Sequence, residues 1–225
     1  MPARCLFYYI TDRTALGPDE PTRRRRLLEK ISEAAHAGVD YIQLREKDLS
    51  TRDLESLAHE AVTLLNQLRT DHQPLPTALL INHRTDIALA TGSDGVHLRS
   101  TDIAPNDVRE IWQASCGRGP LARAIPHDPI IAVSCHSPAE AAQAAAQTAT
   151  FAVFAPVFGK KGNADSQPTG LAALREACTA NIPVLALGSI TPSNARTCLA
   201  AGAAGIAAIR LFQENNIAEI VRTLR

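Results

Sequence analysis

The chain has no excess of charge of either sign. Its 225 residues contain 23 Lys and Arg and 23 Asp and Glu, so the formal net charge is zero. Because nucleic acids and anionic membranes attract strongly basic proteins, this balance argues against both as partners. The one basic cluster, Arg23 to Arg26, opens a segment with the apolar spacing of an amphipathic helix, and we interpret it as a solvated helix face.

Long apolar runs and paired cysteines are also lacking. No uninterrupted apolar stretch is long enough to cross a bilayer. Residues Met1 to Arg4 lead directly into a strand-like run, without the long apolar region of a signal peptide. The five cysteines are scattered and lack metal-ligand spacing, which favours a reduced chain over a disulfide scaffold. We therefore expect a cytoplasmic protein.

Strand-like and helix-like segments alternate along the whole chain. The expected strands are residues 6–10, 39–44, 78–81, 95–98, 130–133, 151–155, 184–187 and 205–209. The expected helices are residues 22–37, 50–69, 85–91, 105–114, 138–147, 169–179, 192–201 and 217–224. Because buried parallel strands alternate with the helices that cover them, this pattern predicts a single α/β domain over residues 1–225, a (β/α)8 TIM barrel. An open doubly wound sheet is the alternative, but no glycine-rich dinucleotide turn follows the first strand.

Polar side chains follow nearly every expected strand, at the end where TIM barrels carry their active sites. On an extended segment Gln43, Arg45 and Lys47 would share one face, and cations at a strand end suit a phosphate or diphosphate. The alternative is a solvated strand end at which Arg45 pairs with a helix carboxylate. The other candidates are Asp12, Asn82, His83, Arg84, His97, Arg99, Asp102, Ser134, His136, Lys160, Lys161, Gly188, Ser189, Ile209 and Arg210.

Motifs in the same order along nearly the whole chain resemble thiamine-phosphate synthases and the related thiazole tautomerases. The motifs are Tyr9 to Asp12, Gly38 to Lys47, Ile81-Asn82, Asp94 to Leu98, Val133 to Ser137, Pro156 to Phe158 and Gly202 to Ala207. The resemblance implies a transferase of thiamine biosynthesis that couples hydroxymethylpyrimidine diphosphate to thiazole phosphate and releases diphosphate. It also implies small phosphorylated substrates and Mg²⁺, and a homo-oligomer stays open.

The resemblance implies roles for individual residues as well. Gln43, Arg45, Lys47 and Asn82 would hold the pyrimidine diphosphate, and Asp102 would be a magnesium ligand. Ser134 and His136 would border the organic substrates, while Gly188 and Ile209 would offer backbone amides to the thiazole phosphate. The catalytic candidates are Arg45, Lys47, His136 and Lys161.

Several positions depart from the family pattern. His83 stands where the second magnesium-binding carboxylate is expected, and imidazole is a poorer ligand for a hard cation. The loop from Phe158 to Gly162 keeps lysines but lacks the family's hydroxyl residues. Ser189 replaces a glycine and Arg210 replaces a serine, so Arg99 and Arg210 could supply cationic charge to a phosphate.

These departures leave two other functions open. A thiazole tautomerase would use His136 as an acid or base and would need no metal. A catalytically silent protein that binds a phosphorylated ligand is the third reading. His136 could also simply cap a loop, and His97, which lies inside an apolar run, is expected to be structural.

Overall fold

The computed structural model describes residues 4–70, 77–116, 128–159 and 167–225. Eight parallel strands pair in chain order, and β8 pairs with β1 to close a barrel. The strands are β1 (Leu6–Ile10), β2 (Tyr41–Leu44), β3 (Ala78–Asn82), β4 (Gly95–Leu98), β5 (Ile130–Cys135), β6 (Phe151–Phe154), β7 (Val184–Ala186) and β8 (Gly205–Ala208). The predicted TIM barrel is confirmed, and the open sheet is excluded.

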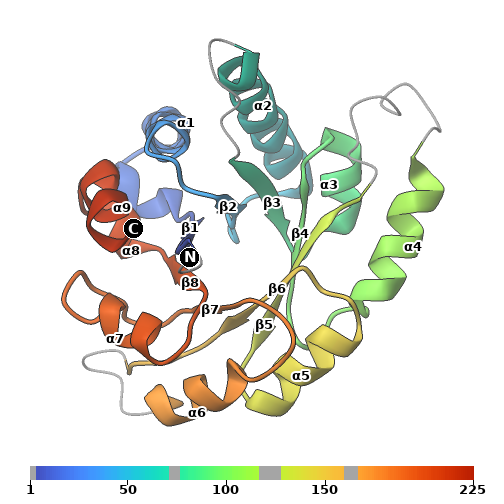
Figure 1. The fold of residues 1–225 in the computed structure, drawn as a ribbon. Coiled ribbons are helices and arrows are strands. Elements are labelled where there is room, and N and C mark those ends of the chain that lie inside the picture. The colour runs from blue at the N-terminus through green and yellow to red at the C-terminus, as the bar shows by residue number, and fades with distance from the viewer. Residues whose placement is uncertain (1–3, 71–76, 117–127, 160–166) are drawn as a thin grey trace.

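Helices surround the barrel on its outside (Figure 1). They are η1 (Arg13–Leu16), α1 (Glu20–His36), α2 (Thr51–Thr70), α3 (Thr85–Thr91), α4 (Pro105–Ser115), α5 (Pro138–Ala146), α6 (Gly170–Ala177), α7 (Ala195–Ala200), α8 (Arg210–Gln213) and α9 (Ile217–Leu224). In the described part of the chain, no helix is long and apolar enough to span a membrane. The sequence did not predict η1 and α8, because a single turn is too short to show helical periodicity.

Several predicted boundaries differ from the observed ones by one to three residues, and for two of them the local hydrogen bonds give the reason. The second strand begins at Tyr41 instead of residue 39, because the Val39 N–H still bonds to the Ala34 carbonyl at the end of α1. The helix predicted from residue 192 begins at Ala195. There Thr191 and Asn194 form a turn in which the backbone N–H of each bonds to the side chain of the other.

Helix starts follow the capping chemistry of the sequence. The Asp19 carboxylate accepts a hydrogen bond from the Thr22 N–H at the start of α1, next to Pro21. At the start of α2, the Ser50 hydroxyl accepts a hydrogen bond from the Asp53 N–H over 3.2 Å. These bonds satisfy backbone donors that have no partner within the helix.

Alternate residues of each strand separate two apolar regions. Tyr8, Leu80, Phe151 and Leu185 pack with one another inside the barrel, while the other strand face packs against the helices. Inside the barrel, the Tyr8 and Phe151 rings meet edge to face with their centroids 5.3 Å apart. The interior is therefore filled by side chains, and a substrate can enter only at its ends.

Candidate active site

Two amide side chains meet near the carboxyl ends of β2 and β3. We refer to the carboxyl ends of the eight strands, with the loops that follow them, as the rim. Gln43 is 2% exposed, and its Nε2 donates a hydrogen bond to Asn82 Oδ1 over 2.9 Å. This bond joins neighbouring strands and fixes the orientation of both amides at the rim.

A buried histidine links three strands beneath the rim. Nδ1 of His97 in β4 lies 3.0 Å from the Tyr8 hydroxyl of β1, and Nε2 lies 2.8 Å from Ser134 Oγ of β5. A neutral imidazole has one donor and one acceptor nitrogen, so both contacts can be made at once. These contacts agree with the expectation that His97 is structural, and they also show that His97 holds the candidate Ser134.

Burial and charge set the protonation state of His97. Burial is the main cause that lowers the pKa of His97 to about 3; the positive charge of Arg45 contributes to the shift, and Asp102 opposes it. The imidazole therefore stays neutral at physiological pH. Among the candidates from the sequence, Ser134 is the one whose side chain contacts His97 directly.

The two candidate cations lie just beyond β2. The strand ends at Leu44, so the predicted alternation is not carried by a strand as far as Lys47, which lies in an exposed turn. Arg45 is half-buried, and its backbone N–H donates to Thr11 Oγ1 over 3.0 Å. The hydrogen bond ties this segment to the end of β1.

An ionic network that the sequence analysis did not identify lies beside these cations. Glu46 is buried and contacts the Thr11 hydroxyl and the Arg13 guanidinium. Burial raises the pKa of Glu46 above its ordinary value, and the hydrogen bonds from Thr11 and Arg13 limit the rise. An arginine three residues after β1 and a glutamate between two cations were the available signals, but their pairing is not visible in the sequence.

The candidate metal ligands do not form a metal site of their own. Among the residues that the structure describes, no group of three or more His, Cys, Asp or Glu side chains is arranged to hold a metal ion. The Asp102 carboxylate accepts hydrogen bonds from the Arg99 backbone N–H over 2.8 Å and from Arg99 Nε over 3.1 Å. His83 has a φ of 48°, and its backbone N–H donates to the His97 carbonyl. One carboxylate fits a magnesium ion that takes most of its ligands from substrate phosphates.

His136 lies on another part of the rim, after β5. Its side chain is exposed, and Nδ1 lies 2.7 Å from the Ala155 carbonyl oxygen at the end of β6. Its backbone N–H donates to the Glu140 carboxylate. Because a carbonyl oxygen can only accept, Nδ1 carries the proton and Nε2 is the acceptor of the neutral ring.

After β7 and β8, the notable features of the rim are backbone conformations. Gly188 has a φ of 115°, and a Cβ there would lie 2.7 Å from Pro156 Cα. Ser189 also has a positive φ, and its carbonyl accepts a bond from Asn194 Nδ2. Ile209 and Arg210 stand where β8 passes into α8. Lys160 and Lys161 lie outside the described residues.

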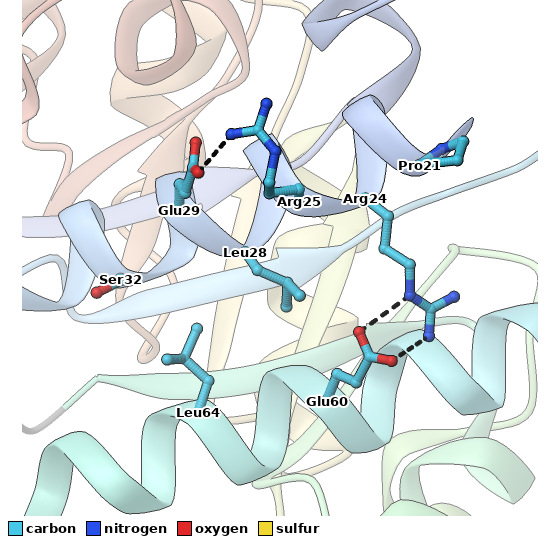
Figure 2. Close-up of a pocket in the computed structure, with 8 residues that line it drawn as sticks. All are labelled: Pro21, Arg24, Arg25, Leu28, Glu29, Ser32, Glu60 and Leu64. Atoms are coloured by element: carbon cyan, nitrogen blue, oxygen red, sulfur yellow. Dashed lines mark hydrogen bonds and ion pairs between the residues drawn. The ribbon is translucent and has the colours of Figure 1, made fainter. Parts of the chain in front are cut away.

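A surface groove between α1 and α2 lies in the outer helical layer (Figure 2). Arg24 bridges the helices through Glu60 and Ser56, while Arg25 pairs with Glu29. The groove contains side chains of the arginine cluster and none of the rim candidates. The partners of Arg24 and Arg25 agree with the interpretation of this cluster as a solvated helix face.

Comparison with known proteins identifies similar chains. The family model described as thiamine monophosphate synthase matches residues 7–212. The thiamine-phosphate synthase of Methanoculleus marisnigri is 35% identical over 97% of this chain and 92% of its own length. That of Roseiflexus castenholzii is 36% identical over 92% of this chain and 80% of its own. The solved thiamine phosphate pyrophosphorylase from Pyrococcus furiosus superposes with a TM-score of 0.73, at 28% identity over 98% of this chain and 93% of that one.

Proposed function

The chain belongs to the thiamine monophosphate synthase family, and we propose that it is a transferase that joins hydroxymethylpyrimidine diphosphate to thiazole phosphate and releases diphosphate. The observation that carries this proposal is the set of polar side chains at neighbouring strand ends, with Arg45 directly after β2 and Ser134 of β5 held by the neutral His97 of β4. The Gln43–Asn82 pair stands at the ends of the neighbouring strands β2 and β3. Arg45 can thus bind an anion, while Ser134 and the two amides add uncharged polar groups to the site.

The reaction breaks a bond between the pyrimidine methylene carbon and a diphosphate oxygen, and it forms a bond from that carbon to the thiazole nitrogen. Negative charge grows on the departing diphosphate, so cations placed there stabilise the transition state more than the ground state. Arg45 can bind phosphate oxygens through two parallel N–H donors, and Lys47 adds a second charge. We assign both residues to the diphosphate, with Gln43 and Asn82 as neutral donors.

The methylene carbon becomes electron-deficient as diphosphate leaves. A cation beside this carbon would oppose the reaction, whereas a neutral side chain would not. The low pKa keeps His97 uncharged, and the imidazole orients the Ser134 hydroxyl. We assign Ser134 to the pyrimidine and His97 to the support of Ser134. Gly188, Ser189, Ile209 and Arg210 are assigned to the thiazole phosphate, because glycine lets backbone N–H groups approach an anion closely.

Enzymes of this family are generally magnesium-dependent. We propose that Asp102 is the residue that would hold Mg²⁺, together with diphosphate oxygens, and His83 is a weak additional candidate. When bound, the ion would neutralise charge on the diphosphate. Small phosphorylated molecules are the proposed substrates, and a cytoplasmic location and a homo-oligomeric state remain part of the proposal.

Turnover tests this function directly. The purified protein should release diphosphate and form thiamine phosphate when both substrates are present, and activity should fall when magnesium is chelated. Omitting either substrate is the control for hydrolysis. If neither product nor diphosphate forms while thiazole phosphate still binds, the protein is a silent binder of phosphorylated ligands.

A thiazole tautomerase is the second candidate, and it rests on His136. The Ala155 carbonyl orients the ring so that Nε2 can accept a proton, as a general base requires. The rim cations favour the synthase, because aromatising a thiazole carboxylate phosphate expels no diphosphate. Aromatisation without coupling activity would favour the tautomerase.

A further inference from the structure

A buried ion pair lies directly behind the segment that carries Arg45 and Lys47. The side chains of Arg13 and Glu46 are 2% and 1% exposed. Glu46 Oε2 accepts a hydrogen bond from the Arg13 backbone N–H over 2.9 Å and another from Arg13 Nη1 over 3.3 Å. Removing two charges from water is costly, and apolar residues of similar size often stabilise a fold as well. A contribution to stability therefore does not explain the pair.

Arg13 contacts the residues that precede and follow Lys47 in the chain. Arg13 Nη1 bonds to Glu46 and, over 2.6 Å, to Asp48 Oδ1, so one guanidinium holds the residues on both sides of Lys47. The other edge of the guanidinium bonds to Glu20 of α1 through Nε and Nη2, over 3.0 and 2.8 Å. Helix α1 thus holds Arg13, and Arg13 holds the turn after β2.

Thr11 makes the matching contacts on the other side of Glu46. Its hydroxyl oxygen accepts the Arg45 backbone N–H over 3.0 Å and donates to Glu46 Oε1. Thr11 is fully buried at the end of β1. The backbone at Arg45 and the side chains of Glu46 and Asp48 are therefore all held by the β1–α1 connection.

We propose that Thr11, Arg13 and Glu46 are positioning residues that hold Arg45 and Lys47 in place for the diphosphate group of the substrate; this inference rests on the proposed function. Arginine and lysine are long, and ordering them together with their loop costs entropy at the moment of binding. A loop that is already held in the free protein avoids part of that cost. Glu46 touches no substrate in this arrangement and acts through its neighbours.

Glu46→Gln tests the proposal, with Glu60→Gln as the matched control. Both variants remove a carboxylate that bonds to an arginine, but Glu60 pairs with Arg24 in the outer helical layer, whereas Glu46 is joined to Arg13 and through Thr11 to Arg45. We expect Glu46→Gln to weaken the binding of inorganic pyrophosphate at least tenfold by calorimetry. KM should rise for the pyrimidine diphosphate and stay within twofold for thiazole phosphate. Glu60→Gln should stay within twofold of the wild type in all three measurements.

A second pair of variants alters the same chain of contacts, from Glu46 through Thr11 to Arg45, without removing a charged group. Thr11→Val keeps the side-chain shape and removes the hydroxyl, whereas Thr11→Ser keeps the hydroxyl. We expect Thr11→Val to reproduce the selective loss seen in Glu46→Gln, and Thr11→Ser to bind pyrophosphate like the wild type. The double variant Thr11→Val/Glu46→Gln should lose less pyrophosphate affinity than the product of the two separate fold losses, because both changes act on the same chain of contacts. This pair also decides the matter if Glu46→Gln fails to fold.

Two results would overturn the proposal. One is pyrophosphate affinity within twofold of the wild type in folded Glu46→Gln and Thr11→Val proteins; the other is an equal rise of KM for both substrates. A wild type that binds pyrophosphate but couples nothing would refute the proposed function alone, and the pyrophosphate affinities would then judge this inference. A wild type that neither binds pyrophosphate nor turns over would overturn both.

Discussion

At the rim, the side chain that contacts Ser134 is the uncharged imidazole of His97. Its neutrality comes mainly from burial inside the barrel, next to the Tyr8 hydroxyl, and the positive charge of Arg45 adds to the effect. At the scale of single residues, Arg45 and Lys47 thus carry positive charge, whereas His97 and Ser134 are neutral and polar. This division matches a reaction in which an anion leaves and an electron-deficient carbon remains.

The low pKa of His97 predicts a loss of stability in mild acid. Burial lowers this pKa from 6.5 to about 3, so between these values the unfolded chain binds more protons than the folded protein. The free energy of unfolding should thus fall as the pH falls from 6.5, by at most about 1.4 kcal/mol per pH unit through this residue. His97→Gln should show a shallower slope in urea unfolding at pH 7.5, 6 and 5. An equal slope in both proteins would assign the effect to another group.

Arg45 should contribute strongly to diphosphate binding. A charge-assisted hydrogen bond contributes about 1.5–3 kcal/mol, so Arg45→Ala should weaken pyrimidine-diphosphate binding by about that amount in calorimetry. Arg25→Ala is the matched control, because Arg25 pairs with Glu29 on the exposed face of α1. Equal affinity of the two variants would remove Arg45 from the anion site.

His83 tests the metal assignment. If it stands beside the magnesium ion, His83→Asp should lower the magnesium concentration needed for half-maximal coupling, because a hard cation prefers a carboxylate to imidazole. Asp102→Asn should raise that concentration. If His83→Asp and the wild type give the same magnesium titration, His83 does not contact the ion.

At the scale of elements, the barrel closes where β8 lies against β1. Gly205 starts β8, and a Cβ there would overlap the Leu6 carbonyl oxygen of β1. This overlap involves backbone atoms of two paired strands, so it cannot be relieved by rotating a side chain. The same strands continue toward the rim, where β8 ends beside Ile209 and Arg210 and β1 ends beside Thr11.

Gly205→Ala should therefore destabilise the fold. Inserting a methyl group into such close packing typically costs about 1–3 kcal/mol. We expect the free energy of unfolding, measured by urea denaturation, to fall by that amount. Gly17→Ala is the control, since its added Cβ would lie 2.8 Å from Thr22 Cγ2, the end of a side chain that can rotate, and 3.4 Å from the nearest backbone atom, the Arg23 amide nitrogen. A Gly205→Ala protein as stable as Gly17→Ala would mean that the β1–β8 contact adjusts freely.

At the scale of the whole molecule, the barrel offers two candidate reaction centres on one rim. One comprises Arg45 directly after β2 and the His97–Ser134 pair of β4 and β5, and in the other His136 and Gly188 lie around the β6 end at Ala155 and Pro156. A synthase uses both parts, because it must bind two phosphorylated substrates. A tautomerase needs only one substrate site and a proton acceptor.

The variants Lys47→Ala and His136→Ala distinguish the two reactions. In a synthase, Lys47→Ala should lose far more coupling rate than His136→Ala, because charge on the leaving diphosphate limits the reaction. In a tautomerase, His136→Ala should abolish aromatisation while phosphate-ligand binding persists. Both variants are assayed in both reactions, and a coupling rate that depends on His136 alone would contradict the synthase assignment.

The sequence by itself determined the number and order of the strands and of every described helix longer than a single turn, and with them the closed barrel. This information is local, because an apolar run of a few residues or a 3.6-residue period is written in consecutive positions. The barrel rule then placed Gln43, Asn82 and Ser134 near the rim from their positions close to the strand ends. The segments η1 and α8 escaped prediction because they are too short to show a period.

Tertiary structure alone decided the partners. The Tyr8–His97 contact joins residues 89 positions apart, and the Arg13–Glu46 pair joins residues 33 positions apart. Nothing in the neighbouring residues specifies such a partner, so the sequence shows neither the link from His97 to Ser134 nor the role of Glu46. The barrel brings distant strand ends together, and the low dielectric of its interior makes each buried polar group depend on a specific neighbour. The residue types were thus readable in advance, whereas their pairing and protonation followed from closure of the barrel.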